Sequence, residues 1–199
     1  MFIEMIKRRY IQKQRAESRG ETRQKIIEAT AAIHEEFGPR QSTISAIAER
    51  AGVQRLTVYR HFPDEGVLFE ACTAHWLERH PPPGPETWAG ESGSARVRTA
   101  LASLYAYYRA TRRMWTVSYR DVEDVPALQG PMKAFGAYLE SIVADLLTAV
   151  DASGSDPRAG ATLGAAVQFA TWRALDGQGL DDDAKASLVG DWLAGIVSR

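Results

Sequence analysis

The sequence lacks the features of an exported, membrane-bound or disulfide-stabilised protein. Its 199 residues include a single cysteine, Cys72, so no internal disulfide can form, and this fits a reducing cytoplasm. No apolar run approaches the roughly 20 residues that a membrane span requires, and charged residues interrupt the apolar N-terminus, unlike a secretory signal. We therefore expect a cytoplasmic protein without membrane contact, in which Cys72 is a small core residue.

Residue patterns that support catalysis or metal binding are also missing. The sequence shows no nucleophile–base set and no phosphate loop; His75 and His80 are isolated, and His34 has no second ligand at a metal spacing. We predict no catalytic residues, no metal and no cofactor, with His34 partly exposed on a helix. An enzyme that uses an aromatic cleft is an alternative, but it would leave the motif described below unexplained.

Alternating strand patterns are absent, whereas apolar residues recur with helical periodicity. We predict an all-α protein of about nine helices. Prolines and glycines should interrupt the helices within residues 81–94, 122–130 and 153–157. The helices are expected at about residues 21–37, 43–51, 54–62, 64–80, 95–112, 114–121, 131–152, 157–176 and 181–197.

Apolar positions at helical spacing identify the candidate core. In the first helix the expected buried residues are Ile26, Ala29, Ile33 and Phe37. In the fourth helix they are Val67, Leu68, Ala71, Cys72 and Trp76. In the helix at 131–152 they are Phe135, Leu139, Ile142, Leu146 and Val150.

The formal net charge of −1 conceals an uneven distribution. Residues 1–62 hold 12 Lys and Arg against 7 Asp and Glu, whereas residues 63–199 hold 12 against 18. A basic N-terminal third beside an acidic remainder is typical of a protein in which one module faces phosphate and the other does not.

Residues 43–63 have the pattern of two short helices joined by a glycine turn. Ile44, Ile47, Ala48 and Ala51 form one apolar helix face, and Gly52 follows where the helix must stop. Val58 and Phe62 would lie on the core side of the second helix. This arrangement predicts a helix-turn-helix, whose second helix enters the major groove of DNA.

The motif also resembles a known family. Phe37-Gly38, Ile47-Ala48, Ala51-Gly52-Val53 and the run from Thr57 to Phe62 follow the order and spacing of the tetracycline-repressor (TetR) family of bacterial regulators. The resemblance extends from about Thr22 to Leu68; beyond it, only an architecture is implied. It implies a DNA-binding domain at 21–63, preceded by a basic arm at 1–20 and followed by a helical ligand-binding and dimerisation domain at 64–199.

Candidate DNA contacts lie at the starts of the two motif helices. Either hydroxyl of Ser42 or Thr43 could cap the first helix, and the same helix end can bind a phosphate. In the first turn of the second helix, Gln54, Arg55 and Leu56 are placed to read adenine, guanine and a thymine methyl group. The resemblance implies backbone contacts for a further three residues, namely Thr57, Tyr59 and His61.

Two positions depart from the family pattern. Glu65 stands where the family commonly has a lysine, and Ser45 stands where it often has an arginine. The basic residues of the arm, which include Lys7, Arg15 and Arg19, could compensate by contacting the DNA backbone. The alternative interpretation of residues 1–20 is a solvated, partly disordered tail.

The helices near the C-terminus contain the candidate dimer contacts. The helix expected at 157–176 is rich in small residues, which favour close approach of another helix, although they could also pack within one subunit. The family pairs its last two helices with those of a second copy in a four-helix bundle. We therefore predict a homodimer, with candidate contacts at Gly160, Gly164, Ala165, Leu188 and Trp192.

The aromatic residues of the 64–199 domain are the candidates for an effector pocket. Aromatic residues at helical spacing are commonly core, but ligand sites in helical bundles are apolar with a few polar groups. The resemblance implies a small molecule, which we expect to be aromatic or amphipathic and to release a repressor from its operator. A regulator with a filled cleft that responds to a protein partner is the alternative. The candidate pocket residues are Trp76, Tyr105, Tyr108, Arg109, Trp115, Tyr119, Tyr138, Gln168 and Trp172.

Overall fold

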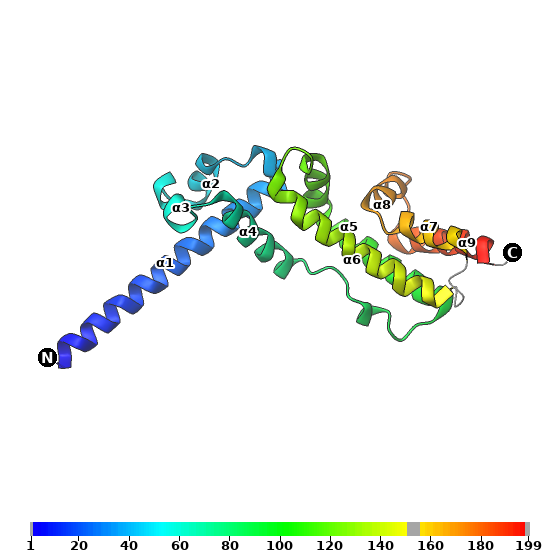
Figure 1. Ribbon diagram of the computed structural model, residues 1–199, viewed down its shortest axis with the longest axis horizontal. Helices are drawn as coiled ribbons and strands as arrows, with labels where there is room; N and C mark the ends of the chain where they lie inside the picture. The colour runs from blue at the N-terminus through cyan, green and yellow to red at the C-terminus, as the bar shows by residue number, and fades with distance from the viewer. Residues whose placement is uncertain (1, 151–155, 198–199) are drawn as a thin grey trace.

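A single long helix, α1 (Phe2–Phe37), dominates the N-terminal third of the computed structural model, which describes residues 2–150 and 156–197 (Figure 1). The boundary expected near Glu21 is wrong, because the helix continues through Gly20. One glycine costs a helix about 1 kcal/mol relative to alanine, and the neighbouring Lys, Gln, Arg, Ala and Glu residues favour the helix. Residues 12–20 are all exposed. The side chains of Lys7, Arg8 and Arg9 lie outside the described part of the chain.

Four helices form the head of the molecule. The C-terminal half of α1 packs against α2 (Ile44–Ala51) and α4 (Glu65–Arg79), and α3 (Arg55–His61) packs against α2; a short 3-10 turn, η1 (Pro39–Gln41), precedes α2. Their shared core confirms the apolar pattern read from the motif. Its members include Ile26, Ile47, Val58, Phe62, Leu68 and Cys72.

Three expected burial assignments in the head are wrong. The Phe37 and Val67 side chains are 49% and 47% exposed, whereas His34 is only 6% exposed. Thr30 and His34, one turn apart, both lie on the buried face of α1, whereas Phe37 is the last residue of the helix and is exposed there. In α4 the residue that turns inward beside Leu68 is Phe69.

Two long helices, α5 (Gly93–Asp121) and α6 (Pro126–Val150), pack together and form the frame of the body (Figure 1). The expected break between residues 112 and 114 is wrong, because no Gly or Pro there interrupts the helix. The helix α6 begins five residues earlier than expected, at Pro126, and contains Pro131 within it. The sequence predicts a loop up to Gly130 and a helix start at Pro131. Proline is well tolerated in the first turn of a helix, so the helix can begin already at Pro126.

The helix expected at 157–176 is divided into α7 (Pro157–Ala166) and α8 (Phe169–Asp176). No proline or glycine causes this break. Instead, the hydroxyls of Tyr105 and Tyr108 on α5 donate hydrogen bonds to the carbonyl oxygens of Ala166 and Val167, at 2.9 and 2.7 Å. The tyrosines thus satisfy two carbonyl groups that a continuous helix would have used internally, which stabilises the kink.

The last helix, α9 (Asp182–Val197), packs along α5 close to its expected bounds. Its Lys185 is fully buried and donates hydrogen bonds to Asp176 and Asp182, at 2.9 and 3.1 Å. The segment between α4 and α5 contains the 3-10 turn η2 (Pro85–Thr87) and is held to α6, because the buried Trp88 donates its Nε1 hydrogen to Asp145 at 2.8 Å.

In the residues that the structure describes, every regular element is a helix, so the all-α fold class is confirmed. None of these helices combines the length and apolarity needed to cross a bilayer. The end of the helix expected at 131–152 and most of the break expected at 153–157 lie outside the described residues.

Candidate nucleic-acid interface and junction cavity

The helix-turn-helix has the local geometry that its sequence predicts. The Thr43 hydroxyl caps α2 by accepting a hydrogen bond from the Ala46 N–H at 3.2 Å. At the other end, Gly52 adopts a left-handed conformation with φ of 67°, and α3 begins after Gln54. A residue with a Cβ atom would be strained at this φ, so Gly52 is the residue that allows the tight turn.

The helix α3 presents a polar and aromatic face to solvent. Val58 is fully buried and anchors the helix, whereas Gln54 and Arg55 are exposed. Leu56 and Tyr59 are also exposed, at 56% and 41%, although both are large and partly apolar. This exposed face of α3 contains all three residues expected to read base edges.

The backbone-contact candidates have different environments. Thr57 and His61 are half-buried, and both line an open groove between α3 and α1. The Ser42 hydroxyl is buried and has no hydrogen-bond partner; it lines a small pocket that also includes Val125 and Ala127 of the body. Ser42 therefore lines the pocket shared with the body, and of the two candidate caps it is Thr43 that caps α2.

The groove between α1 and α3 has a volume of about 470 Å³ and a polar, cationic lining. Burial lowers the pKa of His61, and the nearby cations Arg19 and Arg23 lower it further. The positive charge of α1 therefore extends to the second motif helix, which the sequence did not reveal. The groove is lined by Gln14, Arg15, Ser18, Arg19, Thr22, Thr57 and His61.

A polar cluster joins the head to the body at the end of α5. The Arg120 guanidinium donates to the carbonyl of Phe37 at 2.7 Å and to the Asp121 carboxylate at 2.6 Å. Asp121 is fully buried and also accepts from the backbone N–H of Arg40. The Arg120 guanidinium keeps the pKa of Asp121 below its ordinary value, so the ion pair persists at neutral pH. Gly38, with φ of 91°, packs directly against both side chains and leaves no space for a Cβ atom.

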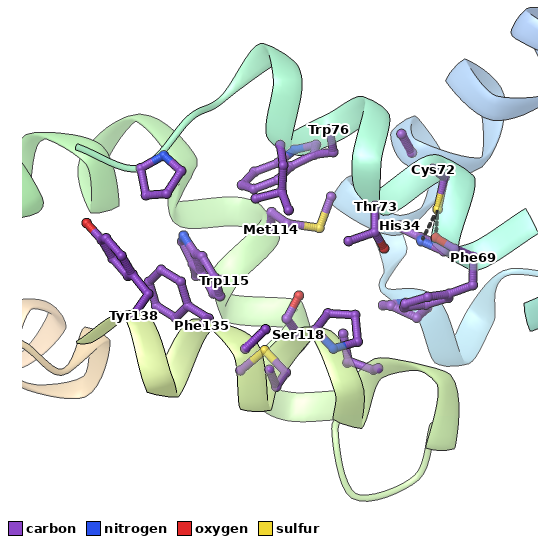
Figure 2. A pocket seen from close by; sticks show the side chains of 18 residues that line it. His34, Phe69, Cys72, Thr73, Trp76, Met114, Trp115, Ser118, Phe135 and Tyr138 are labelled. Carbon is purple, nitrogen blue, oxygen red and sulfur yellow. Dashed lines mark hydrogen bonds between the residues drawn. The ribbon is translucent and has the colours of Figure 1, made fainter. Parts of the chain in front are cut away.

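A cavity of about 300 Å³ lies where the head meets the body (Figure 2). Its walls come from α1, η1 and α4 on the head side and from α5 and α6 on the body side. Of the nine expected pocket residues, it includes Trp76, Trp115 and Tyr138. The labelled lining residues are His34, Phe69, Cys72, Thr73, Trp76, Met114, Trp115, Ser118, Phe135 and Tyr138.

The other six expected pocket residues lie outside this cavity. Tyr105 and Tyr108 stabilise the α7–α8 kink, as described above, and burial raises the pKa of both hydroxyls. Trp172 is buried and donates its Nε1 hydrogen to Asp182 at 3.3 Å. The remaining three are bound at the surface: Arg109 pairs with Asp182, Tyr119 stacks on Phe169, and Gln168 donates to the carbonyl of Gly164.

Sequence reasoning missed most of the cavity lining, His34 and Phe69 in particular. A signal was available for His34, because Ile26, Thr30 and His34 follow one another at intervals of four residues and therefore share one helix face. Because Thr30 and His34 are polar, a search for apolar residues at helical spacing did not identify this buried helix face. For α5 the signal was the absence of Gly and Pro between residues 95 and 121, which allows one unbroken helix and so brings Met114 and Ser118 opposite α4.

The titratable groups of the cavity do not form a reactive or metal-binding site. Burial lowers the pKa of His34 to about 4 and raises that of the Cys72 thiol to about 12, so both are neutral at pH 7. The thiol donates to the carbonyl of Phe69 at 3.1 Å. Within the described residues, no three His, Cys, Asp or Glu side chains are grouped so that they could hold a metal ion.

Comparison with known proteins supports the same interpretation of the head. Residues 26–72 match the model of the bacterial regulatory proteins of the tetR family. A stretch of 58 residues is 43% identical to the HTH-type transcriptional regulator BetI of Yersinia pestis, and this stretch is 29% of each protein. The match therefore spans less than a third of that relative.

Solved structures share the fold over most of the chain. A TetR-like transcriptional regulator from Rhodococcus sp. RHA1 superposes with a TM-score of 0.64 at 23% identity, covering 89% of this chain and 97% of the other. A transcriptional regulator from Pseudomonas aeruginosa PAO1 gives a TM-score of 0.66 at 14% identity, covering 88% and 90%. NalD of P. aeruginosa, a repressor of a multidrug efflux pump, gives 0.58 at 20% identity, covering 88% and 95%.

These findings agree on the head and on the fold. Residues 26–72 are similar to the DNA-binding region of bacterial regulatory proteins of the tetR family, with its helix-turn-helix. The solved structures, at 14–23% identity, show a fold shared over 88–89% of this chain.

Proposed function

We propose that the protein is a dimeric transcription regulator, acting as a repressor, that binds operator DNA through α3 and is released by a small-molecule effector. The observation that carries this proposal is the exposure of Gln54, Arg55 and Leu56 on a helix whose opposite side is fixed in the core by Val58. A bidentate arginine–guanine contact contributes about 1–3 kcal/mol of discrimination between bases.

The basic part of α1 would add contacts with the DNA backbone. Arg15 and Arg19 line the same groove as Thr57 and His61, so a phosphate that approaches α3 from this side meets cations from both helices. These contacts carry no base information. They would replace the positive charge that Ser45 and Glu65 do not supply.

The proposed dimer surface lies on α9 and α7. Trp192 is 44% exposed, and Leu188 is half-buried on the same helix. On α7, a Cβ atom built on Gly164 would meet nothing within 4 Å, so a second helix can approach there. Ala165 is exposed, and Gly160 lies near Leu147 of α6 and so belongs partly to the packing within one chain.

The dimer is tested by the molar mass in solution. Trp192→Glu should convert a dimer into a monomer in sedimentation or light-scattering measurements, because a charge would be buried at the contact. Val67→Glu changes a similarly exposed apolar residue on the head and should leave the mass unchanged. A wild-type chain that remains monomeric at micromolar concentration would contradict the dimer.

The junction cavity is the proposed effector site. Its lining includes Ala31 and His34 from the head and Trp115 and Ser118 from the body, so an occupant would contact both units. With half-sites about 34–36 Å apart, a small rotation of each head would break the match with DNA. A ligand shifts this equilibrium only if it binds one arrangement better than the other.

Selection of bound duplexes from a random pool tests the DNA-binding function. We expect a two-fold symmetric sequence with half-sites one helical turn apart, bound by the wild type and lost in Arg55→Ala. A selected pool without sequence preference would contradict the proposal. Repeating the selection with cell lysate in place of purified effectors would show whether a protein partner, rather than a ligand, controls binding.

A further inference from the structure

The composition of the junction cavity restricts the chemistry of its occupant. Its 18 lining residues include no Asp, Glu, Lys or Arg, and its walls are mainly aromatic, aliphatic and thioether side chains. The expected polar anchors Arg109 and Gln168 lie elsewhere. Figure 2 shows the hydroxyl groups of Thr73 and Ser118 in the space between α4 and α5.

The three titratable groups of the lining, His34, Cys72 and Tyr138, do not alter this neutrality at pH 7. Burial favours the uncharged imidazole of His34 and the uncharged thiol of Cys72, and these two side chains lie 3.5 Å apart. The carboxylate of Asp121, whose charge partly offsets the lowering of the His34 pKa by burial, lies outside the lining and is bound to Arg120 and to the backbone of Arg40. The tyrosine of the lining, Tyr138, donates its hydroxyl hydrogen to the carbonyl of Pro83.

An ionised ligand would lose its hydration in this cavity without gaining a counter-charge. The free-energy cost of burying an unpaired charge is large, whereas apolar surface gains by leaving water. The cavity is also about twice the volume of the roughly 150 Å³ cavity that accommodates benzene, so it suits two fused rings. Trp76, Trp115 and Phe135 provide ring faces and edges for such a ligand.

The cavity lining also contains hydrogen-bond donors without a partner. The Nε1 atoms of Trp76 and Trp115 are both buried without a hydrogen-bond partner, and each side chain is only 6% exposed. An acceptor atom on the ligand, such as an ether or carbonyl oxygen, would satisfy a donor of this kind.

We propose that the junction cavity binds a neutral, two-ring aromatic molecule with a hydrogen-bond acceptor, and that it excludes anions and cations of the same shape. This inference rests on the proposed effector role of the cavity. Its occupant would contact His34 and Phe69 of the head as well as Met114 and Phe135 of the body, and so would act directly at the junction.

Three matched naphthalene derivatives test the proposal on the full-length protein: 2-methoxynaphthalene, 2-naphthoate and 2-naphthylmethylammonium. At a hundredfold excess over its dissociation constant, the neutral compound should raise Tm by about 5–10 °C. The two charged compounds should leave Tm unchanged at the same concentration. Stronger binding of either ion, or no shift with the neutral compound, would overturn the proposal.

A charge placed in the lining should reverse the selectivity. Met132 is half-buried in the cavity wall, and Met132→Lys adds a cation there on a long flexible stem. We expect 2-naphthoate to bind this variant at least tenfold more tightly than it binds the wild type. Met132→Gln adds polarity without charge and should produce no gain. An equal gain in both variants would contradict the electrostatic account.

Operator binding without any compound separates this inference from the proposed function. If wild type and both Met132 variants bind the selected operator but no neutral compound shifts Tm, the ligand class is wrong and the DNA-binding function stands. If no operator is selected while the neutral compound stabilises the protein, the cavity assignment stands and the regulator proposal fails.

Discussion

The exposed face of α3 and the junction cavity are opposite kinds of surface. The face of α3 is open, polar and flanked by cations from α1, whereas the cavity is only partly open, is lined mainly by aromatic and aliphatic side chains, and has no formal charge in its lining. The two surfaces therefore suit different partners. Burying a charged group in the cavity would be unfavourable, and a small apolar molecule would bury little apolar surface on the face of α3.

The difference also shows how the two surfaces can be connected. The core of the head includes Cys72, which lines the cavity, and Val58, which anchors α3. The Arg120–Asp121 pair holds the end of α1 to the last turn of α5, which also contributes Ser118 to the cavity. A change at the cavity therefore has short physical routes to the orientation of the head.

Acid should protonate His34 and so place a charge in the cavity lining. The resulting loss of unfolding free energy is the largest effect that we expect. His34 has a pKa of about 4 in the folded protein and about 6.5 when unfolded, so the unfolded state binds more protons between these values. Neutral, buried His34 therefore contributes to the free energy of unfolding. This contribution, about 3 kcal/mol, is complete above pH 6.5 and is lost as the pH falls towards 4.

Denaturant unfolding at several pH values measures this effect. His34→Gln keeps a polar side chain that stays neutral, so its unfolding free energy should lack the pH dependence caused by His34. The difference in unfolding free energy between wild type and variant should therefore change by about 3 kcal/mol between pH 6.5 and pH 4. A constant difference would show that His34 is not buried in the neutral form.

The proposed contact of the α3 face with base edges can be removed by one substitution. The wild type should bind the selected operator more tightly than a duplex in which one guanine is changed. Arg55→Ala should reduce this difference in binding free energy by about 1–3 kcal/mol, because the bidentate contact is lost. Tyr59→Phe is the matched comparison and should weaken binding to both sites equally. Fluorescence anisotropy with the two duplexes provides the measurement; unchanged discrimination in Arg55→Ala would exclude Arg55 as a base contact.

The structural role of Tyr108 can be distinguished from a ligand-binding role. Tyr108→Phe removes the buried hydrogen bond to Val167 and should lower the unfolding free energy by about 1–2 kcal/mol. The affinity for 2-methoxynaphthalene should not change, because Tyr108 lies outside the cavity lining. Tyr10→Phe, at an exposed position on α1, should be neutral within about 0.5 kcal/mol. A loss of ligand affinity in Tyr108→Phe would extend the site towards α8.

The smallest expected change concerns the cations of α1. Replacing Arg15 and Arg19 by alanine should make the slope of log affinity against log salt concentration shallower by about 2, one unit for each lost phosphate contact. Deletion of residues 1–19 should lower operator affinity and flatten the slope at least as much. Lys13 pairs with Glu17 and does not line the groove, so Lys13→Ala is the control. An unchanged slope in the double variant would remove α1 from the DNA interface.

The head was predictable because short-range rules determine it. The Thr43 cap, the left-handed Gly52 and the apolar spacing of Ile47 and Val58 act within a few residues, and the structure has each of them where the sequence predicts it. Ser42 is the exception, since its burial depends on contacts with a loop more than eighty residues away.

The body was less predictable because long-range contacts decide its details. The kink between α7 and α8 depends on tyrosine hydroxyls from α5, some sixty residues earlier. An aromatic residue identified from the sequence alone can stabilise such a kink or line a cavity, and Tyr108 and Trp115 illustrate the two outcomes. The cavity itself arises where two domains meet, and no local pattern indicates that place.

Reciprocal binding of operator and effector tests the central claim most directly. The dissociation constant of the selected operator should be measured with and without saturating 2-methoxynaphthalene, and that of the compound with and without operator. The account predicts that each ligand weakens the other by the same factor, as thermodynamic linkage requires for two sites on one equilibrium. Two dissociation constants that do not respond to the other ligand would contradict it.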